Sequence, residues 1–451
     1  IKLSISRNGR FRKLESKSYF SYGRMLYRPS AYIPAGRILI DTVNSFNYSE
    51  GGLKGILLAS RLACIPPNYA ARFTPGTLIS SYEVYEALKM GIAVPFRKRD
   101  AENTRTLEEL KLVDRGGMIF QPEPGVYEKV FQLDFTSMYP AIIVKYNLSP
   151  ESPNGRKGFL PKVLEPLLNM RIETKRKKKE NPEYKGLDSV LKWMLVTCFG
   201  YTGYRNAKFG RVEVHESINR IGREILLKAK EIAESMGFEV LHGIVDCLWL
   251  RGNDIKALKE KVERETGLLT DIENYSWIVF LPMSDGSGAY NRYYGRLTDG
   301  KLKLRGVIAR RSDMPEYIRK MQLELFEELS GAESVREISA LKDRLLEIYR
   351  SYRNRLKKGE VNPRLLSIRR RISKLGYSRK CPELNAIKAY RNSGIRLSPG
   401  MDVSFVIRDA RRWIVDPPWR ASGYDENYYL KLIDKAWKEI SFALKCSAQG
   451  S

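Results

Sequence analysis

Apolar residues recur at helical spacing in several long stretches of the chain. Residues 216–237 (ESINRIGREILLKAKEIAESMG) give the strongest amphipathic pattern, and Gly237 is the expected end of that helix. Residues 161–199 also have helical spacing, with a break expected near Asn181-Pro182. The same pattern predicts shorter helices over 52–64, 78–91, 253–266 and 425–444.

Short apolar runs bounded by turn residues predict strands between these helices. Residues 116–134 are expected to form strands around the turn Pro122-Glu123-Pro124-Gly125, and 238–250 directly follows the long amphipathic helix. Further strands are predicted within 1–70, 273–305 and 402–415. Because a strand–helix–strand core is flanked by basic helical pieces, the pattern predicts an α+β fold.

The charge balance points to a partner. The chain has 79 Lys and Arg against 52 Asp and Glu, a net charge of +27 in 451 residues. A globular protein this basic is expected to bind a polyanion, and nucleic acid is the leading candidate. A basic surface that serves only solubility is a weaker alternative. A membrane partner is not expected, because no apolar run reaches the ~20 residues of a span.

Cysteine and histidine usage disfavours several kinds of site. The five cysteines are scattered without a CxxC pair, which argues against zinc, an iron–sulfur cluster or a disulfide framework. This usage fits a reducing cytoplasm, the expected location, near the nucleoid. Only His215 and His242 are present, so histidine-based catalysis is not expected.

The segment DFTSMYP, from Asp134 to Pro140, is the strongest chemical signal. Asp134 closes an apolar run, so a strand ending there would present its carboxylate to a metal ion. The following turn would direct backbone N–H groups and Ser137 at a phosphate chain. An ordinary strand-to-turn transition explains this segment equally well when it is considered alone.

Several segments, in order, resemble motifs of the family B DNA polymerases. DFTSMYPAII resembles the first palm motif of that family, and LKWMLVTCFGYTGY resembles its fingers-to-palm motif. LHGIVDCLWL lies where the second palm carboxylate motif belongs. Two segments resemble the palm-to-thumb region of the family, YNRYYGRL and KLKLRGVIARRSDMP. Two later segments resemble its thumb, KCPELNAIKAYRNSGIRLSPGMDVSFVI and DENYYLKLIDKAWKEI.

The resemblance implies the architecture of a polymerase right hand with short fingers. The implied parts are a reduced N-terminal, exonuclease-like region (1–110), a first part of the palm (111–160), fingers (161–199), a second part of the palm (200–305) and a thumb (306–451).

By resemblance, Asp134 and Asp246 are the two catalytic carboxylates, brought together across 112 positions (246 − 134). Two-metal phosphoryl transfer needs such a pair around ions roughly 3.5–4 Å apart. The Phe135 carbonyl would be a further ligand, and this set of oxygen ligands suits Mg²⁺ or Mn²⁺.

The resemblance also assigns nucleotide contacts. Ser137 and the Met138 backbone would hold the triphosphate, and the Tyr139 ring would pack under the sugar and select deoxynucleoside triphosphates. Arg171, Lys175 and Lys192 would bind the incoming phosphates. The neighbouring charges 176–179 are expected to be a solvated basic face.

Contacts with primer–template DNA are implied at further positions. Gly116 and Gly117 would approach the template backbone, and Gly200 and Tyr201 the template side of the nascent pair. Accessory replication or repair subunits are left open as partners. The duplex contacts are expected from Arg292, Tyr293, Arg305 and the basic thumb, including Arg369–Arg371.

Three departures from the family pattern bear on activity. Ile244 replaces the first aspartate of the second carboxylate motif, and Ile244-Val245 is poor turn chemistry. Val196-Thr197-Cys198 replaces an Asn-Ser pair in the fingers motif. Asp41 alone cannot assemble a nuclease site, so no proofreading is expected. The altered pattern looks most like the divergent second group of archaeal family B polymerases.

Three functions are therefore weighed. The first is a non-proofreading DNA-templated DNA polymerase of low efficiency, suited to synthesis across damaged template. The second is a catalytically impaired relic that binds primer–template DNA as an accessory subunit. The third, RNA binding or synthesis, is disfavoured because Tyr139 keeps the sugar gate.

Overall fold

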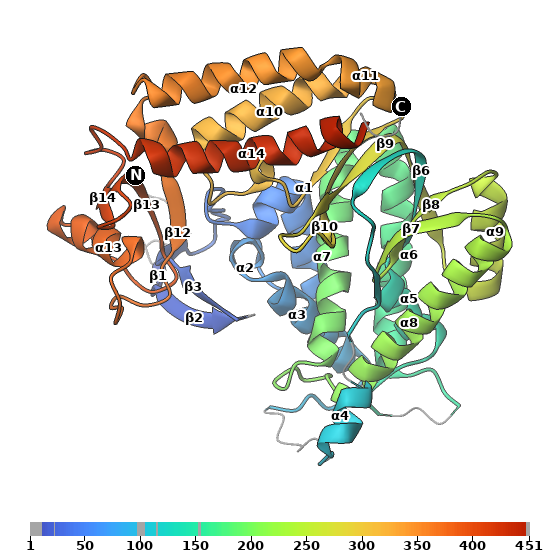
Figure 1. Ribbon diagram of the computed structural model, residues 1–451. Coiled ribbons are helices and arrows are strands. Elements are labelled where there is room, and N and C mark those ends of the chain that lie inside the picture. Colours follow the sequence, from blue (N-terminus) through green and yellow to red (C-terminus); the bar gives the residue numbers. More distant parts are fainter. Residues whose placement is uncertain (1–10, 22, 97–103, 114–115, 152–154, 448–451) are drawn as a thin grey trace. The chain divides into compact units, whose positions relative to one another are not determined.

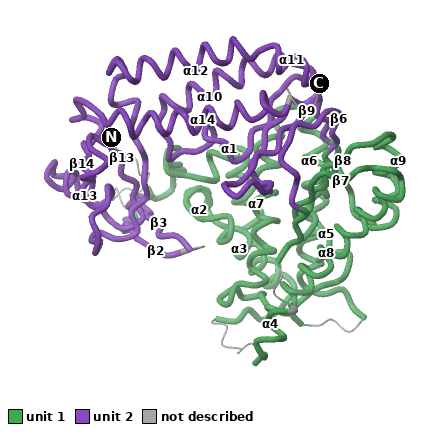
Figure 2. Tube along the Cα trace, in the orientation of Figure 1, with its two compact units in different colours: residues 1–12, 33–120, 132–272 green, residues 13–32, 121–131, 273–451 purple. Residues whose placement is uncertain are grey.

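The computed structural model describes residues 11–21, 23–96, 104–113, 116–151 and 155–447 (Figure 1). The chain divides into two compact units, each assembled from separate segments (Figure 2). Unit 1 comprises residues 1–12, 33–120 and 132–272, and unit 2 comprises residues 13–32, 121–131 and 273–451.

Unit 1 is built mainly of helices. Its helices are α1 (Phe46–Ala63), α2 (Pro67–Arg72), α3 (Pro75–Lys89), α4 (Leu107–Val113), α5 (Met138–Lys145), α6 (Phe159–Glu180), η1 (Pro182–Tyr184), α7 (Lys185–Thr202), α8 (Val212–Ser235) and α9 (Ile255–Thr266). Helices α1, α3 and α6 pack against α7. The predicted break at Asn181-Pro182 is confirmed, because Asn181 ends α6 and its side chain accepts from the Glu183 N–H at 2.9 Å.

The amphipathic helix predicted over 216–237 is confirmed as α8, which is four residues longer at its start. Its buried residues, among them Ile218, Ile225 and Ala229, recur at helical spacing. Gly237 follows with φ of +80°, a conformation that costs glycine little. Helix α1 ends at Ala63, close to the predicted end at residue 64, and Pro67 opens the short helix α2.

The strands of unit 1 place two chain segments side by side. Its strand order is β6 (Gly125–Phe135), β8 (Cys247–Arg251), β7 (Glu239–Ile244) and β5 (Ile119–Phe120), with β6 entering the unit at Gln132. Strands β7 and β8 form a hairpin that pairs Ile244 with Cys247. Strands β1 (Phe11–Leu14) and β4 (Ala31–Pro34) pair in a small separate sheet.

Unit 2 combines strands with a layer of long helices. Its strands are β2 (Lys17–Ser21), β3 (Arg24–Arg28), the start of β6, β9 (Thr270–Pro282), β10 (Gly288–Leu297), β11 (Leu302–Arg305), β12 (Ile368–Arg371), β13 (Asp402–Asp409) and β14 (Ile414–Asp416). Its helices are η2 (Ile308–Arg310), α10 (Glu316–Ser330), α11 (Val335–Ala340), α12 (Lys342–Lys357), η3 (Pro363–Leu366), α13 (Pro382–Asn392) and α14 (Glu426–Ser447).

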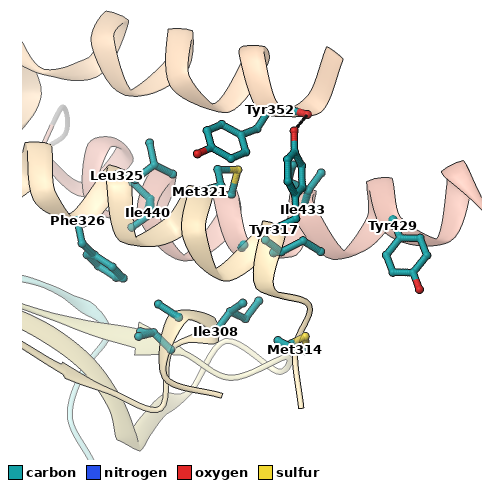
Figure 3. Packing of buried hydrophobic residues seen from close by; sticks show 14 of the residues in the cluster. Ile308, Met314, Tyr317, Met321, Leu325, Phe326, Tyr352, Tyr429, Ile433 and Ile440 are labelled. Carbon is teal, nitrogen blue, oxygen red and sulfur yellow. Dashed lines mark hydrogen bonds between the residues drawn. The ribbon is translucent and has the colours of Figure 1, made fainter. Parts of the chain in front are cut away.

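The core of unit 2 lies between α10, α12 and α14, which contact one another (Figure 3). Met321, Leu325 and Ile433 are fully buried there. The buried Tyr317 hydroxyl donates to the Tyr352 carbonyl oxygen at 3.0 Å, so its polar atom is satisfied within the apolar layer. The mixed helix-and-sheet composition agrees with the predicted α+β class, whereas the boundaries of palm, fingers and thumb stay predictions.

No helix in the described ranges combines the length and the apolar composition that crossing a membrane requires.

Candidate active site

The two predicted catalytic carboxylates lie at the ends of neighbouring strands, β6 and β8. Asp134 is near the end of β6, and Asp246 occupies the turn between β7 and β8. The Phe135 N–H donates to the Asp246 carbonyl oxygen at 2.8 Å, which joins the two segments at that level. Burial, and then the charges of Asp246 and Asp134, raise the pKa of the Cys247 thiol. Asp134 and Asp246 therefore belong to adjoining backbone segments of unit 1, and their joint role as catalytic carboxylates stays a prediction.

The surroundings of Asp246 are partly apolar. Burial raises the pKa of its carboxyl, while the Cys247 thiol, which donates to it at 3.4 Å, and the cations Lys192 and Arg171 oppose the shift. Lys192 is exposed on α7. A metal ion needs the ionised carboxylate, so a cation at this site would favour the charged form of Asp246.

The turn between β7 and β8 is strained, as its sequence predicts. Val245 has φ of +54°, a left-handed conformation that is a genuine outlier for a β-branched residue. The turn is held by hydrogen bonds from the Val245 N–H to the Met118 carbonyl oxygen at 2.9 Å and from the Asp246 N–H to that of Ile244 at 2.6 Å. The poor turn chemistry of Ile244-Val245 is thus reflected in the backbone conformation of Val245, whereas its effect on the position of Asp246 stays a prediction.

Replacing Val245 with asparagine is expected to raise the free energy of unfolding by about 1 kcal/mol, because asparagine tolerates the left-handed region. Thermal and urea unfolding would measure it. The same exchange at Val240, in strand β7, is the matched control and should destabilise the chain. A loss of stability in Val245→Asn equal to that in Val240→Asn would contradict the strain.

The turn after Asp134 is fixed by contacts from three elements. Ser137 has φ of +54° and ψ of +47° and precedes α5. Its hydroxyl accepts a hydrogen bond from the Arg171 guanidinium on α6. The Thr136 N–H donates to the Leu269 carbonyl oxygen at 2.8 Å, and its hydroxyl donates to Asp271 at 2.6 Å. This turn is therefore preorganised.

The three predicted phosphate-binding cations have different surroundings. Arg171 is buried, and its Nε lies 3.6 Å from Oδ1 of the buried Asp188 on α7. Lys175 forms an ion pair with Asp271 and donates to the Thr136 hydroxyl at 3.2 Å. Within the described residues, no acidic side chain forms an ion pair with the exposed Lys192.

Asp188 and Asp271 were not identified from the sequence. Asp188 also binds Lys178, so the half-buried Lys178 pairs with a buried carboxylate and is not part of the solvated face expected for 176–179. The interactions with Lys175 and Thr136 lower the pKa of Asp271, although burial opposes the shift. The one sequence signal that could have identified Asp188 is its position one helical turn before Lys192.

Tyr139 lies in a stack of rings. Its ring is 3.9 Å from that of Phe199 at 22°, and Phe199 is 4.5 Å from His215 at 20°. A Cβ added at Gly222 would come within 3.1 Å of the Tyr139 ring. Burial, and then the charge of Asp246, raise the pKa of Tyr139 to about 12. The ring is fixed near the carboxylates, and its role as sugar gate stays a prediction.

The segments around the glycines predicted to approach DNA also contact other residues of the chain. Gly116 has φ of +59°, and its carbonyl oxygen accepts from Arg223 at 2.7 Å. A Cβ added at Gly117 would come within 2.9 Å of the Val245 side chain. Gly200 precedes Tyr201, whose ring packs so closely on Gly76 that an added Cβ there would overlap it.

The altered fingers motif contains a buried acid–thiol pair. Cys198 on α7 donates to the Glu83 carboxyl of α3 at 3.3 Å, and both side chains are buried. Burial raises the pKa of Glu83 to about 7. Cys198 and Glu83 therefore partner each other's buried polar atoms between α7 and α3.

Glu83 should make stability depend on pH. Because its folded pKa lies near 7 and its ordinary value is 4.5, the unfolded chain releases the proton first, and stability falls as pH rises from about 4.5 to 7. Glu83→Gln should remove this loss and make the chain about 3 kcal/mol more stable than the unchanged protein at pH 8. Urea unfolding at pH 5 and pH 8 would measure it. Parallel pH profiles of the two proteins would contradict the assignment.

The predicted duplex contacts in unit 2 are largely engaged within the unit. Arg292 binds the buried Glu439 at 2.7 Å. Tyr293 is 5% exposed, and Arg305 is exposed opposite it on β11. Contact of these residues with DNA stays a prediction, and Arg305 presents the most surface of the three.

The donor set at Asp134 and Asp246 fits Mg²⁺. In the described ranges, no three His, Cys, Asp or Glu residues gather closely enough to hold a metal ion. Mg²⁺ is usually bound by one or two carboxylates together with substrate phosphates, rather than by a closed protein cage. Asp134, Asp246 and the Phe135 carbonyl offer oxygen donors of that kind on adjoining backbone segments.

Comparison with known proteins adds independent information. The model of the family described as DNA polymerase family B matches residues 84–154 and 152–254, which include both carboxylates. DNA polymerase 2 of Saccharolobus solfataricus is 32% identical over 373 residues, covering 80% of this chain and 56% of that protein. The chain belongs to DNA polymerase family B.

Other members of the family agree. DNA polymerase 2 of Aeropyrum pernix is 28% identical over 382 residues, which cover 77% of this chain and 45% of that protein. The structure of the family B DNA polymerase from Pyrobaculum calidifontis matches with a TM-score of 0.62 and 26% identity, covering 85% of this chain and 53% of that one. The chain thus spans about half the length of these family members.

Proposed function

We propose that the chain is a DNA-templated DNA polymerase that adds deoxynucleotides to a primer 3′ end. The observation that carries this proposal is the hydrogen bond from the Phe135 N–H to the Asp246 carbonyl oxygen, which joins the backbone next to Asp134 to that of Asp246. Membership in DNA polymerase family B supports the same function.

Asp134, Asp246 and the Phe135 carbonyl would hold the divalent ions. Bound Mg²⁺ or Mn²⁺ would supply activation of the primer hydroxyl and neutralisation of the triphosphate. Ser137 and the N–H groups at the start of α5 would orient the phosphates, and Arg171 fixes the Ser137 hydroxyl. Lys192 would be a mobile positive charge for the triphosphate.

Lys175 would change partner during nucleotide binding. In the free chain it binds Asp271. A triphosphate carries more negative charge than one carboxylate, so it would compete for the ammonium group. This exchange, together with the strained Val245 turn beside Asp246, favours a slow enzyme.

Proofreading is not proposed for this chain. The Asp41 carboxylate accepts from the Val43 and Asn44 N–H groups at 3.1 and 3.0 Å and from the Asn44 side chain at 2.9 Å. It therefore acts as a turn-stabilising group. Tolerance of damaged template is an extension of the proposal that follows from the altered motifs.

The second candidate is a DNA-binding relic, and the φ of +54° at Val245 favours it. A distortion of about 1 Å at Asp246 would lower the rate roughly 100-fold. Extension of a labelled primer–template with dNTPs, in Mg²⁺ and separately in Mn²⁺, decides between the two. Extension that an Asp134→Ala preparation lacks supports the polymerase. Tight, salt-sensitive DNA binding without extension in either metal supports the relic.

A further inference from the structure

A groove in unit 2 has a lining dominated by arginine. It has a volume of about 920 Å³ and lies between the β2–β3 hairpin, the segment that follows η2, and strand β12. Six arginines line it: Arg24, Arg310, Arg311, Arg369, Arg370 and Arg371.

The charge of this arginine groove is strongly positive. Its acidic lining residues are Asp313 and Asp402, so six positive and two negative charges leave a net of +4. Asp313 binds Arg311 at 2.8 Å and Arg370 at 2.6 Å. Asp402 is bound in the same way by Arg369 and Arg371, at 2.6 and 3.0 Å.

These carboxylates position the arginines without using up their donors. A guanidinium has five N–H donors, of which one carboxylate takes at most two. In the described part of the chain, neither Arg24 nor Arg310 forms an ion pair, and both are exposed. The groove therefore presents forked donors that match phosphate oxygens.

An exposed aromatic ring lies beside these donors. Phe20 on β2 lines the groove and is 70% exposed. Its hairpin is fixed where β3 meets Gly400, because a Cβ added at Gly400 would overlap the backbone of Leu26. Gly400 has φ of +89° and donates through its N–H to the Ile372 carbonyl oxygen at 2.7 Å. The ring is thus presented by an anchored strand.

We propose that the arginine groove binds single-stranded nucleic acid, with phosphates on its arginines and a base on Phe20. A basic groove with an exposed ring is the arrangement that binds single strands without sequence preference. Its volume is that of a pocket for a small molecule, which suits a few nucleotides rather than a double helix. That the strand is DNA rests on the proposed function.

The test compares the full chain with Arg24→Ala/Arg310→Ala and with Phe20→Ala, using the anisotropy of a short labelled oligo(dT) between about 50 and 200 mM NaCl. The double variant should weaken binding about tenfold and lower the salt slope by about 1.4, near 0.7 for each lost contact. Phe20→Ala should weaken binding about fivefold or more without changing the slope.

The matched control is Lys431→Ala/Lys435→Ala, which removes two exposed charges from α14, outside the groove. Equal weakening by this variant, or none by the groove variants, would overturn the proposal. If the groove variants weaken binding of a blunt duplex as much as they weaken binding of oligo(dT), the proposal would also be overturned, in favour of a duplex site. Because the assay needs no nucleotide addition, a chain without polymerase activity would leave this result unaffected.

Discussion

Asp134→Asn and Asp246→Asn are each expected to lower primer extension in Mg²⁺ on the order of 10³-fold or more. Asparagine keeps the size of the side chain and removes the charge that a divalent ion needs. Loss of either side-chain charge would leave one carboxylate of the proposed pair. Single-turnover extension of a labelled primer would measure the effect.

Binding of primer–template should not weaken in these variants, because each removes a negative charge from a basic protein. Asp41→Asn is the matched control, since its carboxylate is used in a local turn, and it should extend primers at the unchanged rate. Unchanged extension by Asp134→Asn would exclude the two-metal proposal.

Asp188→Leu is expected to lower the free energy of unfolding by about 3 kcal/mol, because it leaves a buried cation without its counter-charge. The Arg171 side chain is 8% exposed, and Asp188 also binds Lys178. The same variant should raise the KM for dNTPs, since Arg171 fixes the Ser137 hydroxyl. Urea unfolding and primer-extension kinetics would measure the two effects.

A double-mutant cycle gives the sharpest form of this test. Asp188→Leu/Arg171→Met should regain most of the lost stability, because buried ion pairs exchange for apolar side chains at little cost. The double variant should keep the raised KM for dNTPs. Glu173→Leu, which removes an exposed partner of Lys177, is the control and should change neither quantity. A double variant less stable than the single one would contradict the pairing.

The sequence was sufficient for elements whose pattern is local. Helix α8 follows from its apolar spacing, and the break at Asn181-Pro182 follows from proline chemistry. Helix α5 could not be predicted in this way. It has only eight residues and contains the β-branched run Ile142-Ile143-Val144, which locally disfavours a helix. Both isoleucines are fully buried, so tertiary packing overrides the local preference.

The same distinction between local sequence patterns and tertiary contacts applies to the candidate site. Asp134 and Asp246 were predicted because ordered motifs identify them. Asp188 and Asp271 act through partners that are distant in sequence: 17 positions separate Asp188 from Arg171 (188 − 171), and 96 separate Asp271 from Lys175. No periodic pattern encodes such pairs, since a single carboxylate on a helix is usually an exposed one.

The stack of Tyr139, Phe199 and His215 joins α5, α7 and α8 through ring faces. Hydrogen bonds are lost when their angles change, whereas stacked rings keep favourable energy when they are displaced sideways. We therefore expect small sideways displacements of the Tyr139 ring to leave its stacking on Phe199 largely intact. The stack would then keep its ring contacts when the three helices shift slightly relative to one another.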